Sequence, residues 1–203
     1  MNKQIMQFKI TLNEVTPRVW RRIQVPGDYS FWDMHCAIRD AMGWHGGHLH
    51  GFTMSRIGNG RINLTQIQMP NPEWDDDGDL DESKEMLYAW FPNRIKQCTY
   101  TYDFGDGWDH TVLFEKALAA EAGKQYPVCI KGKNACPPED CGGSGGYEDL
   151  LSVINKPSSK EGKELREWLM LEKNEIYDPS AWNIDEVEFR NPKTDLRDYL
   201  AEQ

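Results

Sequence analysis

The sequence lacks any apolar run that approaches the ~20 residues a membrane-spanning helix needs. Residues 1–9 show neither the apolar stretch nor the small-residue cleavage site of a secretory signal. Positive charge is also in deficit, since 23 Lys and Arg residues stand against 33 Asp and Glu, giving a net charge of −10. Phosphate backbones are bound by clustered Lys and Arg, so nucleic acid is an unfavourable partner. These absences predict a cytoplasmic protein that does not engage a membrane.

Disulfides are not expected either. The chain has 5 cysteines, an odd number, and no secretory signal, so the thiols should be reduced. The composition is nevertheless that of a folded protein, with 39% hydrophobic and 11% aromatic residues. A length of 203 residues predicts a single domain over 1–203, with a strand-rich part over 1–116 and a loop and helical part over 117–203.

Strict alternation of apolar and polar residues predicts strands over 5–12 and 18–25, joined as a hairpin. Apolar residues at helical spacing predict a helix over 31–42, with Ser30 as its N-cap and Gly43 at its end. Further strands are predicted at 48–57, 61–68 and 127–131. Short helices are predicted at 84–91, 117–122, 147–154, 158–169 (with Trp168 inward), 184–188 and 193–201.

The most regular alternation lies on either side of Gly105-Asp106-Gly107, a typical hairpin signal. A three-residue loop would place Asp103 opposite Asp109 and His110 opposite Tyr102. Strands come first and helices last, which predicts an α+β fold with an antiparallel or mixed sheet and helices packed on it.

Three of the five histidines lie within residues 45–50. If this segment is a strand, His48 and His50 share a face and, with His110, could bind a transition metal. The alternative is that each histidine is an ordinary hydrogen-bonded side chain.

The hairpin concentrates acidic charge, and like charges opposite each other are destabilising. A metal or a cation such as Arg22 would relieve this repulsion, although Asp and Gly also suit the turn itself. The sequence therefore offers these candidate ligand-binding residues: Trp44, Asp103, Asp106, Trp108 and Arg22.

Cys129, Cys136 and Cys141 form a second candidate set, for zinc with one histidine, but their spacing contains no CxxC knuckle. Packing as reduced thiols is the alternative. The glycines at 142, 143, 145 and 146 precede a predicted helix and resemble an anion cradle, which Glu139 and Asp140 would oppose.

Two charged segments are less specific. Residues 73–82 nearly fit a calcium loop, but Lys84 occupies the twelfth position, so a solvated acidic loop is favoured. Arg18, Arg21 and Arg22 could contact phosphates. Arg21, however, falls on the otherwise apolar face of its strand, where it should pair with an acidic turn.

Four blocks of sequence carry a resemblance to a known family. They are Thr16 to Arg22, Trp44 to His50, Tyr102 to His110 and Pro137 to Tyr147. Together they resemble the plasmid pRiA4b ORF-3-like family, over about residues 5–190. The resemblance implies an α+β domain found on chromosomes, plasmids and insertion elements, and it implies no known activity.

The leading hypothesis is a cytoplasmic binding or accessory protein whose partner is a small ligand or another protein. Its site would combine the His48/His50 strand, the Asp103–His110 hairpin and the 136–143 loop. The alternative is a metal-dependent hydrolase, with zinc or another divalent metal as cofactor and Glu139 or Asp140 as general base. A second alternative is a nucleic-acid accessory protein associated with mobile elements. The sequence leaves open whether the chain is an enzyme.

Overall fold

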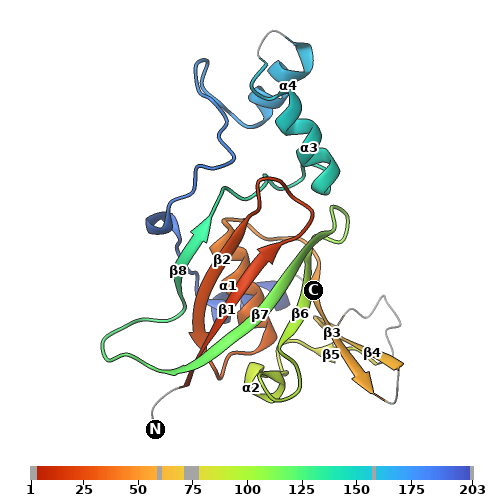
Figure 1. The fold of residues 1–203 in the computed structure, drawn as a ribbon, viewed down its shortest axis with the longest axis vertical. Coiled ribbons are helices and arrows are strands. Elements are labelled where there is room, and N and C mark those ends of the chain that lie inside the picture. The colour runs from red at the N-terminus through yellow and green to blue at the C-terminus, as the bar shows by residue number, and fades with distance from the viewer. Residues whose placement is uncertain (1–3, 59–60, 71–77, 157–158, 202–203) are drawn as a thin grey trace.

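The computed structural model describes residues 4–58, 61–70, 78–156 and 159–201, and its centre is an eight-stranded sheet (Figure 1). The strands lie in the order β5-β4-β3-β6-β7-β1-β2-β8. Only β4 and β5 run parallel, so the predicted α+β fold with a mixed sheet is confirmed. The bounds are β1 Gln4–Leu12, β2 Trp20–Pro26, β3 His50–Gly58, β4 Arg61–Gln68, β5 Leu80–Asp81, β6 Gln97–Tyr102, β7 Trp108–Ala119 and β8 Val128–Lys133.

Helix α1, Phe31–Met42, covers one face of this sheet, and its start is encoded locally (Figure 1). Ser30 Oγ accepts from the Asp33 backbone N–H at 3.1 Å, while the Asp33 carboxylate accepts from the Ser30 N–H at 2.9 Å. Gly43 ends the helix with φ of 92°, a conformation that glycine adopts without steric cost. Every residue of α1 except Asp33 is buried, so the helix and the inward side chains of the sheet form the core.

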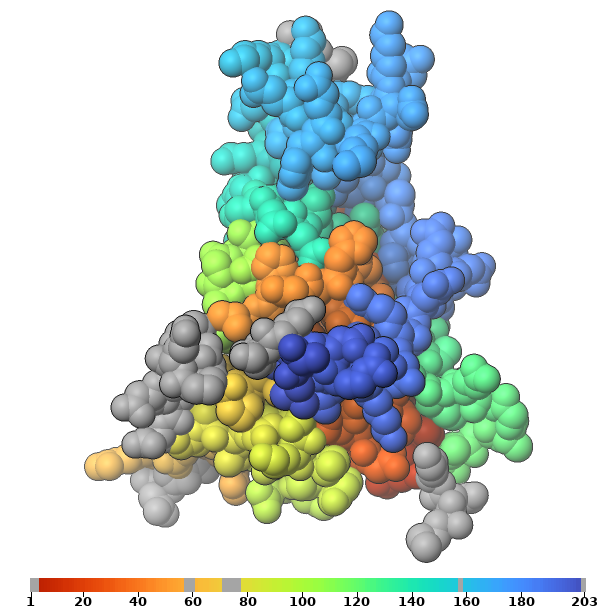
Figure 2. Space-filling model, turned by 180° about the vertical axis from the view of Figure 1, so that it is seen from behind, coloured from red at the N-terminus to blue at the C-terminus, as the bar shows by residue number. Residues whose placement is uncertain are grey.

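The remaining helices lie around this core. Helices α3, Gly143–Val153, and α4, Lys160–Trp168, project together beyond one end of the sheet. Helix α5, Pro192–Ala201, lies across the side seen in Figure 2, where Trp32 Nε1 of α1 donates to the Pro192 carbonyl at 2.9 Å. The other two are the short α2, Leu87–Trp90, and the 3-10 turn η1, Ile184–Glu186. Over the residues described, none of these helices has the length and hydrophobicity to cross a bilayer.

Several local predictions need correction. Residues 117–119 continue β7 because they pair with β1, so no helix begins there. Helix α3 starts at Gly143, four residues before its predicted start. The Trp168 side chain is 44% exposed and does not point into the core. Residues 73–77 of the calcium-loop motif at 73–82 lie outside the described residues.

The β6–β7 hairpin also differs from its predicted register. Tyr102 pairs with Trp108, Thr101 with Asp109 and Tyr100 with His110, so the loop has five residues, 103–107. Asp109 therefore faces Thr101, whose Oγ1 donates to it at 2.5 Å, and the predicted repulsion between Asp103 and Asp109 does not arise.

Candidate functional site

Three segments far apart in the sequence meet at one end of the sheet: the loop after α1, residues 43–49, the β6–β7 turn, 103–107, and the loop before α3, 134–142. Trp44 Nε1 donates to the Pro137 carbonyl at 3.0 Å, and the Gly142 N–H donates to Asp106 Oδ2 at 3.2 Å. The Asp103 N–H donates to the Leu49 carbonyl at 2.8 Å. They overlap the three segments that the sequence analysis combines, although His48 lies in the loop after α1 and only His50 belongs to a strand, β3.

Glu139 is the joint between them. Its carboxylate accepts from the backbone N–H of His45 at 2.8 Å and of Gly46 at 3.4 Å, and from the Tyr102 hydroxyl at 2.5 Å. Burial and the neighbouring Glu139 carboxylate raise the pKa of Tyr102, so the phenol stays a proton donor. With three donors on its two oxygens, Glu139 orients the loops and is poorly placed to act as a general base.

His48, Asp103 and Asp140 converge beside this joint. His48 Nδ1 lies 3.2 Å from Asp103 Oδ2, and His48 Nε2 lies 3.6 Å from Asp140 Oδ1. One candidate ligand atom from each residue lies within 4.8 Å of the other two. In the described part of the chain, no other three His, Cys, Asp or Glu residues satisfy this geometry. Each of the three predicted segments supplies one member of the cluster.

Asp103 and Asp140 both have an unusual backbone conformation. Asp103 has φ of 54° and Asp140 has φ of 60°, in the left-handed region that non-glycine residues rarely occupy. Asp103 Oδ1 accepts from the Gly105 N–H at 2.9 Å and from the Asp106 N–H at 3.3 Å, which leaves Oδ2 directed toward His48. The turn thereby fixes the carboxylate orientation before any ligand arrives.

A model of the plasmid pRiA4b ORF-3-like protein family matches residues 4–186. The chain belongs to this family. Its relatives include the uncharacterized protein y4hQ of Sinorhizobium fredii, 32% identical over 188 residues, which are 92% of this chain and 90% of that protein. A crystal structure of a protein of unknown function from Methanosarcina mazei is also similar, with 36% identity and a TM-score of 0.80. That similarity covers 93% of this chain and 100% of the archaeal one.

The pRiA4b ORF-3-like chain does not assemble the predicted set of three histidines. His50 turns to the fully buried Glu82, its Nε2 lying 2.8 Å from Oε1, and its ring stacks on His35 with centroids 3.3 Å apart. His110 is also fully buried, with Nδ1 placed 3.2 Å from the Tyr100 carbonyl. Burial lowers the pKa of His110 to about 4, so this imidazole is neutral at pH 7. Both are core histidines because β3 and β7 direct their rings inward, and neither joins His48 in the cluster.

The cysteine set is not assembled as a metal centre either. Among the described residues, Cys129, Cys136 and Cys141 have no geometry that groups them around one point, and all five cysteines are free. Burial raises the pKa of Cys136 and of Cys129, which keeps both as thiols. They pack against the core as small apolar side chains.

The remaining candidate residues lie in three places: the core, the outer face of the sheet and the β6–β7 turn. Trp44 and Trp108 are buried, and Trp44 stacks on Tyr102 with ring centroids 4.7 Å apart. Arg22 lies on the outer face of β2, where its Nε meets Glu115 Oε2 at 2.7 Å, so it does not reach the Asp103 turn. The Asp106 carboxylate accepts a hydrogen bond from the Gly142 N–H.

Sequence reasoning missed two features of the site. Glu82 belongs to the segment interpreted as a solvated acidic loop, yet it is fully buried against His50. The pattern Gly-x-Ser-x-Gly at 142–146 is the other, since a nucleophile elbow uses this spacing. That elbow needs a strand directly before it, whereas β8 ends at Lys133, so Ser144 lacks the required context.

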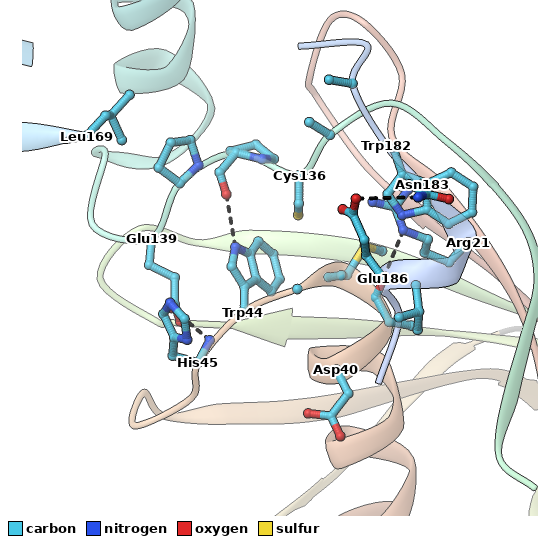
Figure 3. A pocket seen from close by; sticks show the side chains of 18 of the residues that line it. Arg21, Asp40, Trp44, His45, Cys136, Glu139, Leu169, Trp182, Asn183 and Glu186 are labelled. Atoms are coloured by element: carbon cyan, nitrogen blue, oxygen red, sulfur yellow. Dashed lines mark hydrogen bonds between the residues drawn. The ribbon is translucent and has the colours of Figure 1, made fainter. Parts of the chain in front are cut away.

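Two clefts flank the cluster. The first, here called the tryptophan cleft, has a volume of about 620 Å³, and its walls include Arg21, Trp44, Cys136, Asp140, Trp168 and Trp182 (Figure 3). The second, the histidine cleft, has about 570 Å³, with His35, His45, His48 and His50 in its wall. Asp140 lines one cleft and His48 lines the other, so the cluster stands between two spaces large enough for a small molecule.

Proposed function

We propose that the protein is a binding or accessory protein that takes up a divalent cation between His48, Asp103 and Asp140. The observation that carries this proposal is the convergence of three ligand groups within 4.8 Å from three distant segments. One imidazole and two carboxylates suit Mn²⁺, Fe²⁺ or Zn²⁺, and three protein ligands leave coordination positions open. A ligand in either flanking cleft could complete the coordination.

The charge around the cluster supports a cation. The described structure places two carboxylates and no Lys or Arg ion pair on this group. An alternative without metal is a protonated imidazole that pairs with both aspartates, Asp103 on one ring nitrogen and Asp140 on the other. The two alternatives differ in metal affinity, so a titration separates them.

A metal-dependent hydrolase is less well supported by this geometry. Of the two predicted bases, Glu139 already accepts three hydrogen bonds and Asp140 would be a metal ligand. Nucleic-acid association is also weakly supported because the three arginines are dispersed. Arg21 is buried, Arg22 is paired with Glu115, and only Arg18 is exposed.

Calorimetric titration of untagged, chelator-treated protein with Mn²⁺ and with Zn²⁺ tests the proposal. We expect one ion per chain, and at least a tenfold loss of affinity in Asp103→Asn, Asp140→Asn and His48→Gln. Asp109→Asn is the matched control, because Asp109 is exposed on the same hairpin and its side chain bonds only Thr101 among the hydrogen bonds described. Equal affinity in all four variants, or no binding in the micromolar to millimolar range, would overturn the metal site.

A further inference from the structure

The tryptophan cleft contains a buried cation whose charge has no carboxylate partner in the described structure. The Arg21 side chain is 0% exposed, on the inward face of β2. Its ion pairs were expected with an acidic turn, but none of the salt bridges among the described residues includes it. Burying an uncompensated charge costs several kcal/mol, about as much as a small domain's stability allows.

Backbone carbonyls compensate part of that cost. Arg21 Nε donates to the Ala41 carbonyl at 2.8 Å, at the C-terminal end of α1, where the helix dipole favours a cation. Nη1 donates to the carbonyls of Trp20 at 2.9 Å and Lys133 at 3.1 Å. Nη2 is buried and has no hydrogen-bond partner within the described part of the chain.

The indole of Trp182 covers this guanidinium. The Arg21 Cζ lies 4.4 Å from the Trp182 ring centroid, and the indole packs against Gly132. A Cβ at Gly132 would lie 2.5 Å from Trp182 Cη2, so glycine is needed for this contact. Trp182 is half-buried and precedes η1 in a stretch without helix or strand, and it lines the cleft beside Arg21 (Figure 3).

The acidic side chains of the cleft are already committed elsewhere. Asp40 Oδ1 lies 2.9 Å from Arg39 Nη2 and 2.6 Å from Arg190 Nη2. Glu139 holds the loop amides, and Glu186 accepts from Asn183 Nδ2 at 3.4 Å. Asp140 is exposed, and its Oδ1 lies 3.6 Å from His48 Nε2. The charge of Arg21 therefore remains available to a ligand.

From these contacts we infer that the tryptophan cleft binds a small molecule that carries a carboxylate or phosphate group on a flat apolar body. One anionic oxygen accepts from Arg21 Nη2 after the Trp182 indole tilts aside, and the apolar body lies among Trp44, Trp168 and Trp182. Only one nitrogen of the guanidinium is free in the described structure, so the contact is made to a single oxygen and not to a bidentate fork. This inference stands on Arg21 and is independent of the metal proposal.

Calorimetry with benzoate, phenyl phosphate, inorganic phosphate and neutral benzamide, all in chelator, tests it on the full chain. We expect one saturable site for benzoate or phenyl phosphate, with the tighter of the two identifying the anionic group, and no binding of benzamide. Arg21→Met should weaken the binding at least tenfold. Arg22→Met is the matched control, because Arg22 is the next residue of the same strand and faces away from the cleft.

A second variant keeps the test decisive if Arg21→Met does not fold. Ala181 is an exposed residue that lines the cleft, so Ala181→Phe should fill it and abolish binding, whereas Ala122→Phe, exposed elsewhere, should not. Three results would overturn the inference: equal binding of benzamide and benzoate, equal anion binding in all variants (an adventitious ion only), or no saturable binding up to millimolar concentrations.

Discussion

The core and the projecting helices of this protein are stabilised in different ways. Helix α1 buries eleven of its 12 residues, whereas α3 buries three of its 11 and α4 buries only Gly162 and Arg166. The projecting part is fastened by polar contacts, such as the two hydrogen bonds between Asn155 and the Tyr177 backbone at 2.9 and 3.0 Å. Apolar packing thus fixes the positions of the strands, and the loops that carry the cluster are fixed by a small number of hydrogen bonds.

The start of α3, where the projecting helices join the rest of the chain, should be the place where a substitution costs the most stability. A Cβ at Gly146 would collide with the Cys141 carbonyl oxygen, so Gly146→Ala should destabilise the fold by about 3 kcal/mol. A Cβ at Gly145, one position earlier in α3, would have no atom within 4 Å, so Gly145→Ala should be neutral or stabilise by up to about 1 kcal/mol. Urea unfolding monitored by circular dichroism measures both. Equal effects of the two substitutions would show that α3 does not depend on this close approach.

The buried, neutral His110 of the core should make the folding stability depend on pH. His110 has a pKa of about 4 in the folded chain, below the unfolded value of about 6.5, so between these pH values only the unfolded chain takes up the proton. Folding stability therefore falls as the pH drops through this window, and His110 alone accounts for about 2 kcal/mol between pH 7 and pH 5. His110→Asn should reduce the measured pH dependence by that amount. His45→Gln, at an exposed histidine, is the control, and an unchanged slope in His110→Asn would contradict the buried neutral imidazole.

The smallest effect on stability is expected from removing an ion pair on the outer face of the sheet. Arg22 and Glu115 form a bidentate pair, with both distances at 2.7 Å, but their side chains are 25% and 21% exposed. A double-mutant cycle with Arg22→Met and Glu115→Gln should give a coupling below about 1 kcal/mol that shrinks in high salt. A coupling well above that value, unaffected by salt, would mean that this face is covered in solution.

Sequence reasoning worked best where the signal is local. The capping pair Ser30 and Asp33 and the terminal Gly43 define α1, and alternation gives β1, β2 and β4 nearly to the residue. Local patterns sufficed because capping, turn chemistry and side-chain alternation act within a few residues.

The sequence predictions failed where contacts between residues far apart in the chain determine the local structure. The β6–β7 loop is longer than predicted, because Asp103 tolerates a left-handed conformation and its N–H bonds Leu49. Helix α3 begins within the glycine-rich run, at Gly143, where a Cβ would meet the Asp106 backbone, so a distant contact requires glycine at this position. The choice of His48 over His50 and His110 as the metal candidate depends on Glu82 and Tyr100, and neither contact leaves a pattern in the sequence.

The loops of the candidate site are joined by the Glu139 carboxylate and not by a disulfide. Cys136 and Cys141 lie on either side of this residue, yet all five thiols are free and the contacts of Glu139 use only oxygen and nitrogen atoms. A covalent sulfur bridge at this place would open and close with the redox state of its surroundings. Because a carboxylate takes that role, the hydrogen bonds that join the loops of the candidate site need no disulfide.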